Sequence, residues 1–325
     1  MYNELEFLLK EDVYTLRQEA FIEKNRMLKG GLHTHTTRSD GRGTPEEVIR
    51  LFKDNGYDFL ALTDHRIYNF TNFAPETGMI IIPGMELDNG VMPCSNGMRC
   101  FHTLCLGPTK EDGNGYEQDY SFPPVCANNQ EEYQKYLDDA HEKKNLTVYC
   151  HPEWSCTPAR YFEKQKGNFA MEIWNSGCAM DNDMDTDAAY WDELLGQNIR
   201  IFGVATDDGH QMHEHCNGWV MVNAENNLNS ILESLSKGAF YSSCGPEIYD
   251  FYIKDNVAVI DCSEVVKIRL HSDCHPTRIV RSEEGITHAE FSLEGWPGPY
   301  DYARITIIDK DGKYAWTNPI FLNEK

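Results

Sequence analysis

The sequence has few basic residues for its acidic content. It has 29 Lys and Arg against 52 Asp and Glu, and a formal net charge of −23 at pH 7. A surface this negative repels phosphate backbones, which argues against an extended nucleic acid as a partner. The sequence also lacks an apolar run of the roughly 18 to 20 residues that a membrane span needs. The first residues, Met1-Tyr2-Asn3-Glu4, lack the basic start of a signal peptide. We therefore expect a cytoplasmic protein that does not bind membranes.

Paired cysteine motifs are absent as well. The chain has 11 cysteines, an odd number, and no Cys-x-x-Cys pair. Several, such as Cys105 and Cys150, lie in apolar runs typical of strands. This pattern favours buried free thiols in a reducing compartment over disulfides. Cys150 precedes His151 and could serve as a nucleophile, but its position at the end of a strand-like run favours a metal-binding role for this segment.

The middle of the chain alternates between strand-like and helix-like segments. Eight short apolar runs predict strands at Met27–Leu32, Phe59–Thr63, Met79–Pro83, Thr103–Gly107, Leu146–Cys150, Ala170–Trp174, Ile199–Ala205 and Trp219–Val222. Helices are predicted between them, at Gln130–Lys144, Thr186–Gln197 and Leu228–Lys237. A further helix should begin at the capping box Thr44-Pro45-Glu46-Glu47 and end at Gly56. This alternation predicts a parallel α/β architecture, and about seven repeats suggest a barrel.

The two ends of the chain differ from this middle part. Residues 1–29 carry apolar side chains at helical spacing, which predicts an N-terminal helical extension. After Cys244-Gly245-Pro246, strand-like runs follow one another without helices, separated by turn signals at Asp255-Asn256, Glu284-Gly285 and Asp311-Gly312. We therefore predict a barrel over residues 30–245 and a small C-terminal all-β sandwich over residues 246–325.

Metal-ligating side chains gather directly after the predicted strands. They are His33, His35 and Asp40, then Asp64 and His65, then Glu86, then His151, and finally Asp207, Asp208 and His210. His102 opens a strand instead of following one. In α/β barrels the carboxyl ends of the strands share one face, which holds the active site. Imidazole and carboxylate ligands together favour zinc, manganese or iron. The spacing therefore predicts a polynuclear metal site.

These segments resemble the PHP superfamily, named for polymerase and histidinol phosphatase. The resemblance rests on motifs in the family's order: His33–Asp40, Thr63-Asp64-His65, Gly84-Met85-Glu86, Cys150-His151-Pro152 and Asp208-Gly209-His210. The segments Gly238–Pro246 and Ala315–Pro319 are similar to the CehA/McbA-like metallohydrolase branch, which has a C-terminal β-domain. The resemblance implies a distorted (β/α)7 TIM-like barrel and two or three divalent ions.

The resemblance also implies how the ligands are shared. One metal would take His33, His35, Glu86 and Asp208. A second would share Glu86 and add His102 and His151, and a long cysteine-containing loop is expected between Glu86 and His102. A third would take Asp40, His65 and His210. Asp207 remains an alternative to Asp208, and Asp64 is expected to orient its neighbours.

The implied activity is that of a metal-dependent phosphoesterase acting on a small phosphorylated metabolite or nucleotide. A hydroxide bridging the metals, held by Glu86, Asp208, His33 and His35, would attack phosphorus. Arg38, Arg160, Asn175 and His213 are candidates for binding the substrate. Two alternatives stay open: the same metals could cleave a non-phosphate ester, carbamate or amide, or the barrel could bind metal without catalysis. The C-terminal strands would cover the barrel or join an oligomer.

Overall fold

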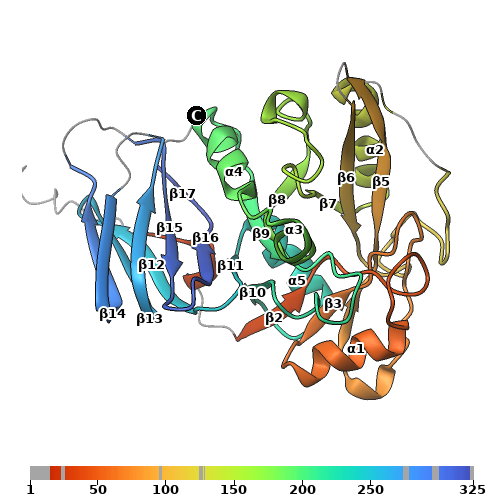
Figure 1. Cartoon of the computed structure of the whole chain (residues 1–325). Coiled ribbons are helices and arrows are strands. Elements are labelled where there is room, and N and C mark those ends of the chain that lie inside the picture. The colour runs from red at the N-terminus through yellow and green to blue at the C-terminus, as the bar shows by residue number, and fades with distance from the viewer. Residues whose placement is uncertain are drawn as a thin grey trace, which may run out of the picture.

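The computed structural model describes residues 15–22, 26–94, 97–123, 127, 129–273, 278–294 and 300–322, with only the backbone at 89–94 and 97–99. Its strands form two hydrogen-bonded sheets (Figure 1). The larger sheet contains β1 (Leu16–Arg17), β2 (Met27–Gly31), β3 (Phe59–Ala61), β4 (Ile80–Ile82), β10 (Trp219–Asn223), β11 (Phe240–Ser243), β12 (Ile248–Lys254), β13 (Val257–His271), β14 (Arg278–Ser292), β15 (Tyr302–Ile308), β16 (Tyr314–Thr317) and β17 (Ile320–Phe321). The smaller sheet contains β5 (Gly84–Cys94), β6 (Gly97–Leu106), β7 (Leu146–Tyr149), β8 (Asn168–Asn175) and β9 (Phe202–Thr206).

The helices of the described residues are short. They are α1 (Pro45–Asp54), α2 (Gln130–Glu142), α3 (Ser176–Asn182), α4 (Asp187–Gly196) and α5 (Leu228–Lys237), with 3-10 turns η1 (Glu19–Phe21), η2 (Pro75–Thr77) and η3 (Ala159–Tyr161). In the described part of the chain, every helix is too short or too polar to cross a bilayer. The capping box predicted at Thr44 is confirmed: the Thr44 hydroxyl accepts from Glu47 N at 3.3 Å, and the Glu47 carboxylate accepts from Thr44 N at 2.9 Å. α1 is followed by Gly56 at φ +78°, which ends the helix as expected.

The α/β prediction is confirmed, but the strands of the described residues do not pair into one closed barrel. Parallel pairing joins β2, β3 and β4 in the larger sheet, and β7, β8 and β9 in the smaller one. Antiparallel pairs such as β10 with β2 make both sheets mixed. The described strands β4 and β5 are not paired with each other, nor are β9 and β10, so the two sheets stay separate in their ladders.

The loop expected between Glu86 and His102 is instead a β-hairpin. β5 and β6 pair antiparallel, with Glu86 opposite Leu104 and Asp88 opposite His102. This hairpin lies at the opposite side of the molecule from β12–β14 (Figure 1). The sequence prediction was wrong here because glycine and cysteine residues interrupt the apolar pattern by which a strand is predicted in this segment. The antiparallel register is what carries His102 back to Glu86.

The helical prediction for the N-terminal segment is wrong over residues 16–22. Leu16 and Arg17 form a strand that pairs with Ile253 and Tyr252 of β12, and Glu19–Phe21 forms a single 3-10 turn. Pairing with a distant strand overrides the local helical spacing. The rest of that prediction, at residues 1–14 and 23–25, lies outside the described residues.

The C-terminal strands continue the larger sheet. β11 pairs with β16, and β16 pairs with β15, so the predicted sandwich is not confirmed as a separate unit. β12 to β16 nevertheless bury a hydrophobic cluster of their own, centred on residues such as Phe251, Ile260 and Ile305. The turn predicted at Glu284-Gly285 is wrong, since both residues lie inside β14, where Gly285 takes φ +96° and the register with β13 shifts. The domain boundaries proposed from the sequence stay predictions.

A buried polar cluster joins the C-terminal strands to α4. The Arg304 cluster consists of Asp192, His271, Arg304 and Thr306. The fully buried Arg304 donates from Nε to Asp192 Oδ1 at 2.8 Å and from Nη1 to Thr306 Oγ1 at 3.1 Å. His271 Nδ1 lies 3.2 Å from Asp192 Oδ2, and His271 Nε2 lies 3.1 Å from Thr306 Oγ1. Each buried charge therefore has a partner, which buried ions require.

Candidate metal centre

The two sheets meet at the predicted site. Two isolated parallel bridges connect them there, between Thr34 and Gly209 and between His65 and Glu86. Thr34 lies between His33 and His35, and Gly209 lies between Asp208 and His210. The predicted ligands thus lie at the strand ends where the separate ladders touch, and backbone pairing fixes their relative positions.

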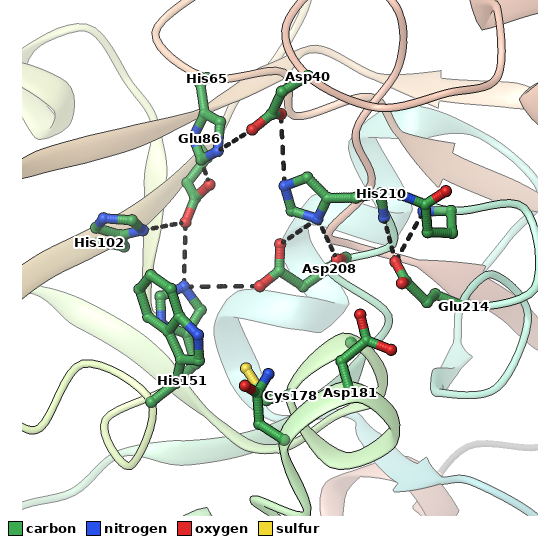
Figure 2. Close-up of a pocket in the computed structure, with 14 residues that line it drawn as sticks. Asp40, His65, Glu86, His102, His151, Cys178, Asp181, Asp208, His210 and Glu214 are labelled. Atoms are coloured by element: carbon green, nitrogen blue, oxygen red, sulfur yellow. Dashed lines mark hydrogen bonds and ion pairs between the residues drawn. The ribbon is translucent and has the colours of Figure 1, made fainter.

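Nine side chains form the cluster at this junction, which we call the histidine cluster: His33, His35, Asp40, His65, Glu86, His102, His151, Asp208 and His210. Seven of them, along with Cys178, Asp181 and Glu214, are labelled in the pocket of Figure 2. All nine were predicted as ligands from the sequence, and the structure brings them together.

Glu86 lies at the centre of the histidine cluster and is fully buried. Its Oε1 is 3.0 Å from His102 Nδ1 and 3.3 Å from His151 Nε2. Its Oε2 is 2.9 Å from His65 Nδ1, 3.3 Å from His35 Nε2 and 3.4 Å from His33 Nε2. Burial would raise the pKa of this carboxyl, but the surrounding imidazoles lower it well below its usual value.

Asp208 closes the other side of His33 and His35. Its Oδ1 is 3.0 Å from His35 Nε2 and 3.2 Å from His33 Nε2, and its Oδ2 is 3.7 Å from His151 Nε2. Burial works against ionisation of Asp208, yet the neighbouring imidazoles keep the pKa of its carboxyl below its usual value. Asp207, the alternative ligand, faces away and accepts the backbone N–H groups of Cys216, Asn217 and Gly218. The geometry therefore places Asp208 in the cluster, while Asp207 holds the loop that follows.

Asp40 forms the third corner. Its carboxylate lies 3.4 Å from His210 Nε2 and 3.6 Å from His65 Nε2 (Figure 2). It also lies 3.8 Å from His35 Nδ1. The next residue must be glycine, because a Cβ at Gly41 would lie 2.5 Å from the carbonyl carbon of His35. Asp64 stabilises the same loop by accepting from Thr36 N at 2.8 Å and from Ser39 Oγ at 2.8 Å. The expectation that Asp64 orients its neighbours agrees with these contacts.

Glu172 supports the cluster from behind and was missed by the sequence analysis. It is fully buried in β8, and its Oε1 is 2.7 Å from His33 Nδ1. The same carboxylate accepts from Thr206 Oγ1 at 2.6 Å, from His151 N at 2.9 Å and from Asn175 Nδ2 at 2.9 Å. A carboxylate on one ring nitrogen leaves the lone pair of the other nitrogen for a metal. The available signal was a single acidic residue inside the apolar run Ala170–Trp174.

The donor set of the histidine cluster fits divalent transition metals. His33, His35, Glu86 and Asp208 each place a ligand atom within 4.8 Å of the others, and so do His35, Asp40, His65 and His210. The Nε2 atoms of His33 and His35 are only 3.2 Å apart. Glu86 Oε2 and His65 Nδ1 are buried, yet neither makes a hydrogen bond of proper geometry among the described residues. Nitrogen and oxygen donors that converge without satisfying one another are what zinc, manganese or iron require.

The predicted substrate-binding residues lie elsewhere or have other contacts. Arg38 donates to Asn69 Oδ1 at 3.0 Å and pairs with Asp119. Arg160 is exposed on η3, with its guanidinium 4.8 Å from the Tyr161 ring. Asn175 donates to Asp208 Oδ2 at 3.1 Å, so it positions a predicted ligand, and His213 is exposed. None of these four is among the described residues that line the cavities at the cluster.

Two cavities that share lining residues open onto the histidine cluster, and other residues that line them were missed by the sequence analysis. One, of about 290 Å³, is lined by Trp154, Gly177, Cys178, Asp181, Asn182, Gln211 and Glu214 besides cluster residues. The other, of about 750 Å³, is lined by Ser39, Arg66, Ile67, Asp88, Ser121, Phe122 and Pro123 besides cluster residues. Asp40, His65 and His102 line both cavities. The candidate metal centre therefore lies where the two cavities meet.

The sequence profile of the PHP domain matches residues 31–289, which is most of the chain. The chain belongs to the PHP family. Its PHP domain runs from the end of β2 into β14 and contains the whole histidine cluster. The resemblance inferred from the motifs is thus confirmed for the family, while the CehA/McbA-like branch stays a prediction.

Other comparisons add structural neighbours of this PHP protein. A two-domain protein containing a predicted PHP-like metal-dependent phosphoesterase from Bacteroides vulgatus shares 14% identity, with a TM-score of 0.47, over 91% of this chain and 95% of that one. An amidohydrolase from Chromobacterium violaceum with bound sulfate and no metal shares 15% identity, with a TM-score of 0.40, over 57% of this chain and 88% of that one. No curated protein matches the sequence.

Proposed function

We propose that this PHP protein is a metal-dependent phosphoesterase that hydrolyses a small phosphorylated molecule. The observation that carries the proposal is the convergence of five imidazoles on the two oxygens of one buried carboxylate, Glu86, at the junction of two cavities. A shared carboxylate of this kind is suited to holding adjacent divalent ions.

The ligands divide into three groups around Glu86 and Asp40. His33, His35, Glu86 and Asp208 would hold one ion, Glu86 with His102 and His151 a second, and Asp40 with His65 and His210 a third. Zinc, manganese or iron would suit these donors. When bound, the ions supply a nucleophile at neutral pH by lowering the pKa of a coordinated water, and they stabilise charge on the phosphoryl group.

The charge of the cavities supports the need for cations. The described lining includes Asp40, Glu86, Asp181, Asp208 and Glu214, and this carboxylate-rich surface repels a phosphate ester on its own. Bound cations would invert that local field and make the site attractive to anions. Glu172 and Asn175 would keep His33 and Asp208 oriented during turnover, because their hydrogen bonds are complete in the buried wall.

Metal analysis and a substrate panel test the proposal. The purified chain should contain divalent transition metal and hydrolyse p-nitrophenyl phosphate or bis(p-nitrophenyl) phosphate with added manganese. The double variant His33→Ala with His35→Ala should lose both metal and activity. His288→Ala is the matched control, since this exposed histidine of β14 lies outside the histidine cluster and both cavities.

Three results would contradict the proposal. Retention of metal and activity in the double variant would remove the histidine cluster from the chemistry. Hydrolysis of p-nitrophenyl acetate, a carbamate or an amide, without hydrolysis of any phosphate ester, would mean that the protein is a metallohydrolase that cleaves a different kind of bond. An absence of hydrolysis of every ester in a metal-loaded sample would favour a non-catalytic module.

A further inference from the structure

The two cavities at the histidine cluster differ in charge. We call the smaller one the acidic lobe, defined beyond the cluster by Asp181, Asn182, Gln211 and Glu214. We call the larger one the arginine lobe, defined by Ser39, Arg66, Ser121 and Phe122. Arg66 is the one arginine or lysine among the described residues that line either lobe. The arginine lobe also includes Asp40 and Asp88, so an anionic substituent of a substrate meets a guanidinium there, whereas the acidic lobe offers it carboxylates without an arginine or lysine.

The backbone of Arg66 is held firmly next to the cluster. Its N–H donates to Glu86 O at 2.7 Å, and its carbonyl accepts from Phe122 N at 2.9 Å. Its φ of +57° is a left-handed conformation that costs about 1 kcal/mol for a non-glycine residue. These two hydrogen bonds maintain that backbone conformation directly after the predicted ligand His65. The position of the Arg66 Cα, from which the side chain extends, is therefore fixed.

The Arg66 side chain forms one ion pair, through Nε, and this contact lacks the geometry of a hydrogen bond. Its Nε lies 2.7 Å from Asp88 Oδ1, and Asp88 Oδ2 lies 3.9 Å from His65 Nδ1. Within the part of the chain that the structure describes, neither Nη nitrogen of Arg66 has a hydrogen-bond partner. Arg38 is different, because its Nη groups pair with Asn69 and Asp119. The terminal fork of Arg66 is thus free to bind an oxyanion with two parallel hydrogen bonds.

The charge of this pair selects the kind of anion. Asp88 offsets the charge of Arg66, so the pair has no net charge and disfavours a dianion more strongly than a monoanion. A carboxylate is a planar monoanion with two oxygens spaced for an arginine fork. A second phosphate would bring about two negative charges to a lobe with a single cation.

We propose that the arginine lobe binds a carboxylate on the leaving-group side of the substrate, so that the substrate is a phosphorylated carboxylic acid. This inference rests on the proposed phosphoesterase function and names the substrate class for the same site. Arg66 would be the residue that sets the specificity, and the acidic lobe would prevent binding in the reverse orientation.

Matched substrate pairs test the inference. 3-Phosphoglycerate differs from glycerol 3-phosphate, and phosphoglycolate from 2-hydroxyethyl phosphate, by a carboxylate in place of a hydroxymethyl group. In at least one pair the manganese-loaded full-length chain should favour the carboxylate by roughly 10- to 100-fold in kcat/KM, the range expected of charge-assisted hydrogen bonds. Arg66→Gln should abolish that preference by raising KM for the carboxylate alone, and Arg66→Lys should restore part of it. Arg50→Gln, which removes an exposed arginine of α1 paired with Glu76, should leave the preference unchanged.

The outcomes separate this inference from the proposed function. Equal hydrolysis within both pairs, or a preference that survives Arg66→Gln, overturns the carboxylate subsite and leaves the phosphoesterase intact. If no phosphate ester is hydrolysed, calorimetric titration of both pairs into the metal-loaded chain decides. If the carboxylate member of a pair binds more tightly than its hydroxymethyl partner, and Arg66→Gln removes that difference, the carboxylate subsite is supported without the phosphoesterase activity. If no such difference is found, both the subsite and the proposed function are overturned.

Discussion

The histidine cluster and the Arg304 cluster are both largely buried and charged, but they satisfy their polar atoms differently. In the Arg304 cluster one cation faces one anion, and His271 and Thr306 complete the remaining hydrogen bonds. In the histidine cluster six imidazoles face three carboxylates, and their lone pairs converge on shared points. A buried cluster that completes itself holds structure together, whereas one whose ligand atoms face one another is built to hold something else.

The two clusters also shift their histidine pKa values in opposite directions. Burial would lower the pKa of His102, but Glu86 raises it to about 10. Burial likewise opposes the charge on His210, but Asp40 and Asp208 raise its pKa to about 9. Burial, helped by the Arg304 charge, lowers the pKa of His271 to about 4. Without metal, the histidine cluster therefore takes up protons, and the Arg304 cluster excludes them.

The largest effect is expected from Glu86→Gln. The amide keeps the shape but loses the shared negative charge, so the ligand groups no longer hold adjacent ions. We expect metal content to fall and kcat/KM to drop by roughly a thousandfold, since the ions supply several kcal/mol to the transition state. Metal analysis and hydrolysis of p-nitrophenyl phosphate measure both effects. Circular dichroism should stay unchanged, and a folded variant with full metal content would contradict the role of Glu86.

The next effect is on stability and comes from Arg304→Met. Removing one partner leaves Asp192 without its cation, which should lower the free energy of unfolding by about 3 kcal/mol. This lies at the lower end for buried pairs because the Asp192 side chain is 34% exposed. Urea unfolding measures it, while metal content and activity per folded molecule should not change. The double variant Arg304→Met with Asp192→Leu should recover part of the loss. If the double variant is no more stable than the single one, the pair does not act as a unit.

Glu172→Gln should have a smaller effect, on metal affinity alone. The amide can still contact His33 Nδ1, but it no longer favours the ring form that presents Nε2 to a metal. Loss of such a supporting carboxylate typically costs about 10- to 100-fold in metal affinity. A manganese titration of activity should shift by that factor, with kcat recovered at saturating metal. Asp187→Asn is the matched control, because Asp187 is buried yet bonds Glu153 N instead of a cluster histidine. An equal shift in the control would mean that Glu172 acts only through packing.

The sequence was sufficient for features that depend on local spacing. The ligands follow strands β2, β3 and β9 within a few residues, so strand prediction alone placed His33, His65 and Asp208 on one face. The capping box of α1 is likewise local. The family followed from the same motifs, because their order along the chain is specific.

Features that depend on pairing between distant segments were not predictable. Glu172 supports His33 across 139 residues, and this contact requires the register of β8 beside β9. Arg66 faces Asp88 because the bridge between His65 and Glu86 brings β5 beside the residues that follow β3. The strand at Leu16–Arg17 forms because it pairs with the edge of β12, and no pattern within residues 16–22 indicates this pairing.

The smallest effect expected is a pair of opposite pH dependences in the metal-free protein. A raised histidine pKa stabilises the fold fully below the unfolded value of about 6.5, and this stabilisation is lost as the pH rises through the folded value. For His210 and His102 the loss should occur as the pH approaches about 9 to 10. A lowered pKa acts in the other direction, so His271 stabilises the fold above about 6.5 and loses this contribution as the pH falls toward about 4.

The midpoints of urea unfolding, measured for the wild type, His102→Asn and His271→Asn from pH 4 to 10, separate the two contributions. His102→Asn should reduce the loss of stability at alkaline pH, and His271→Asn should reduce the loss at acidic pH. If each variant instead changed the other pH range, the contrast between the clusters would be contradicted. Added manganese should reverse the alkaline decline, because metal displaces the same protons and binds more tightly as the pH rises.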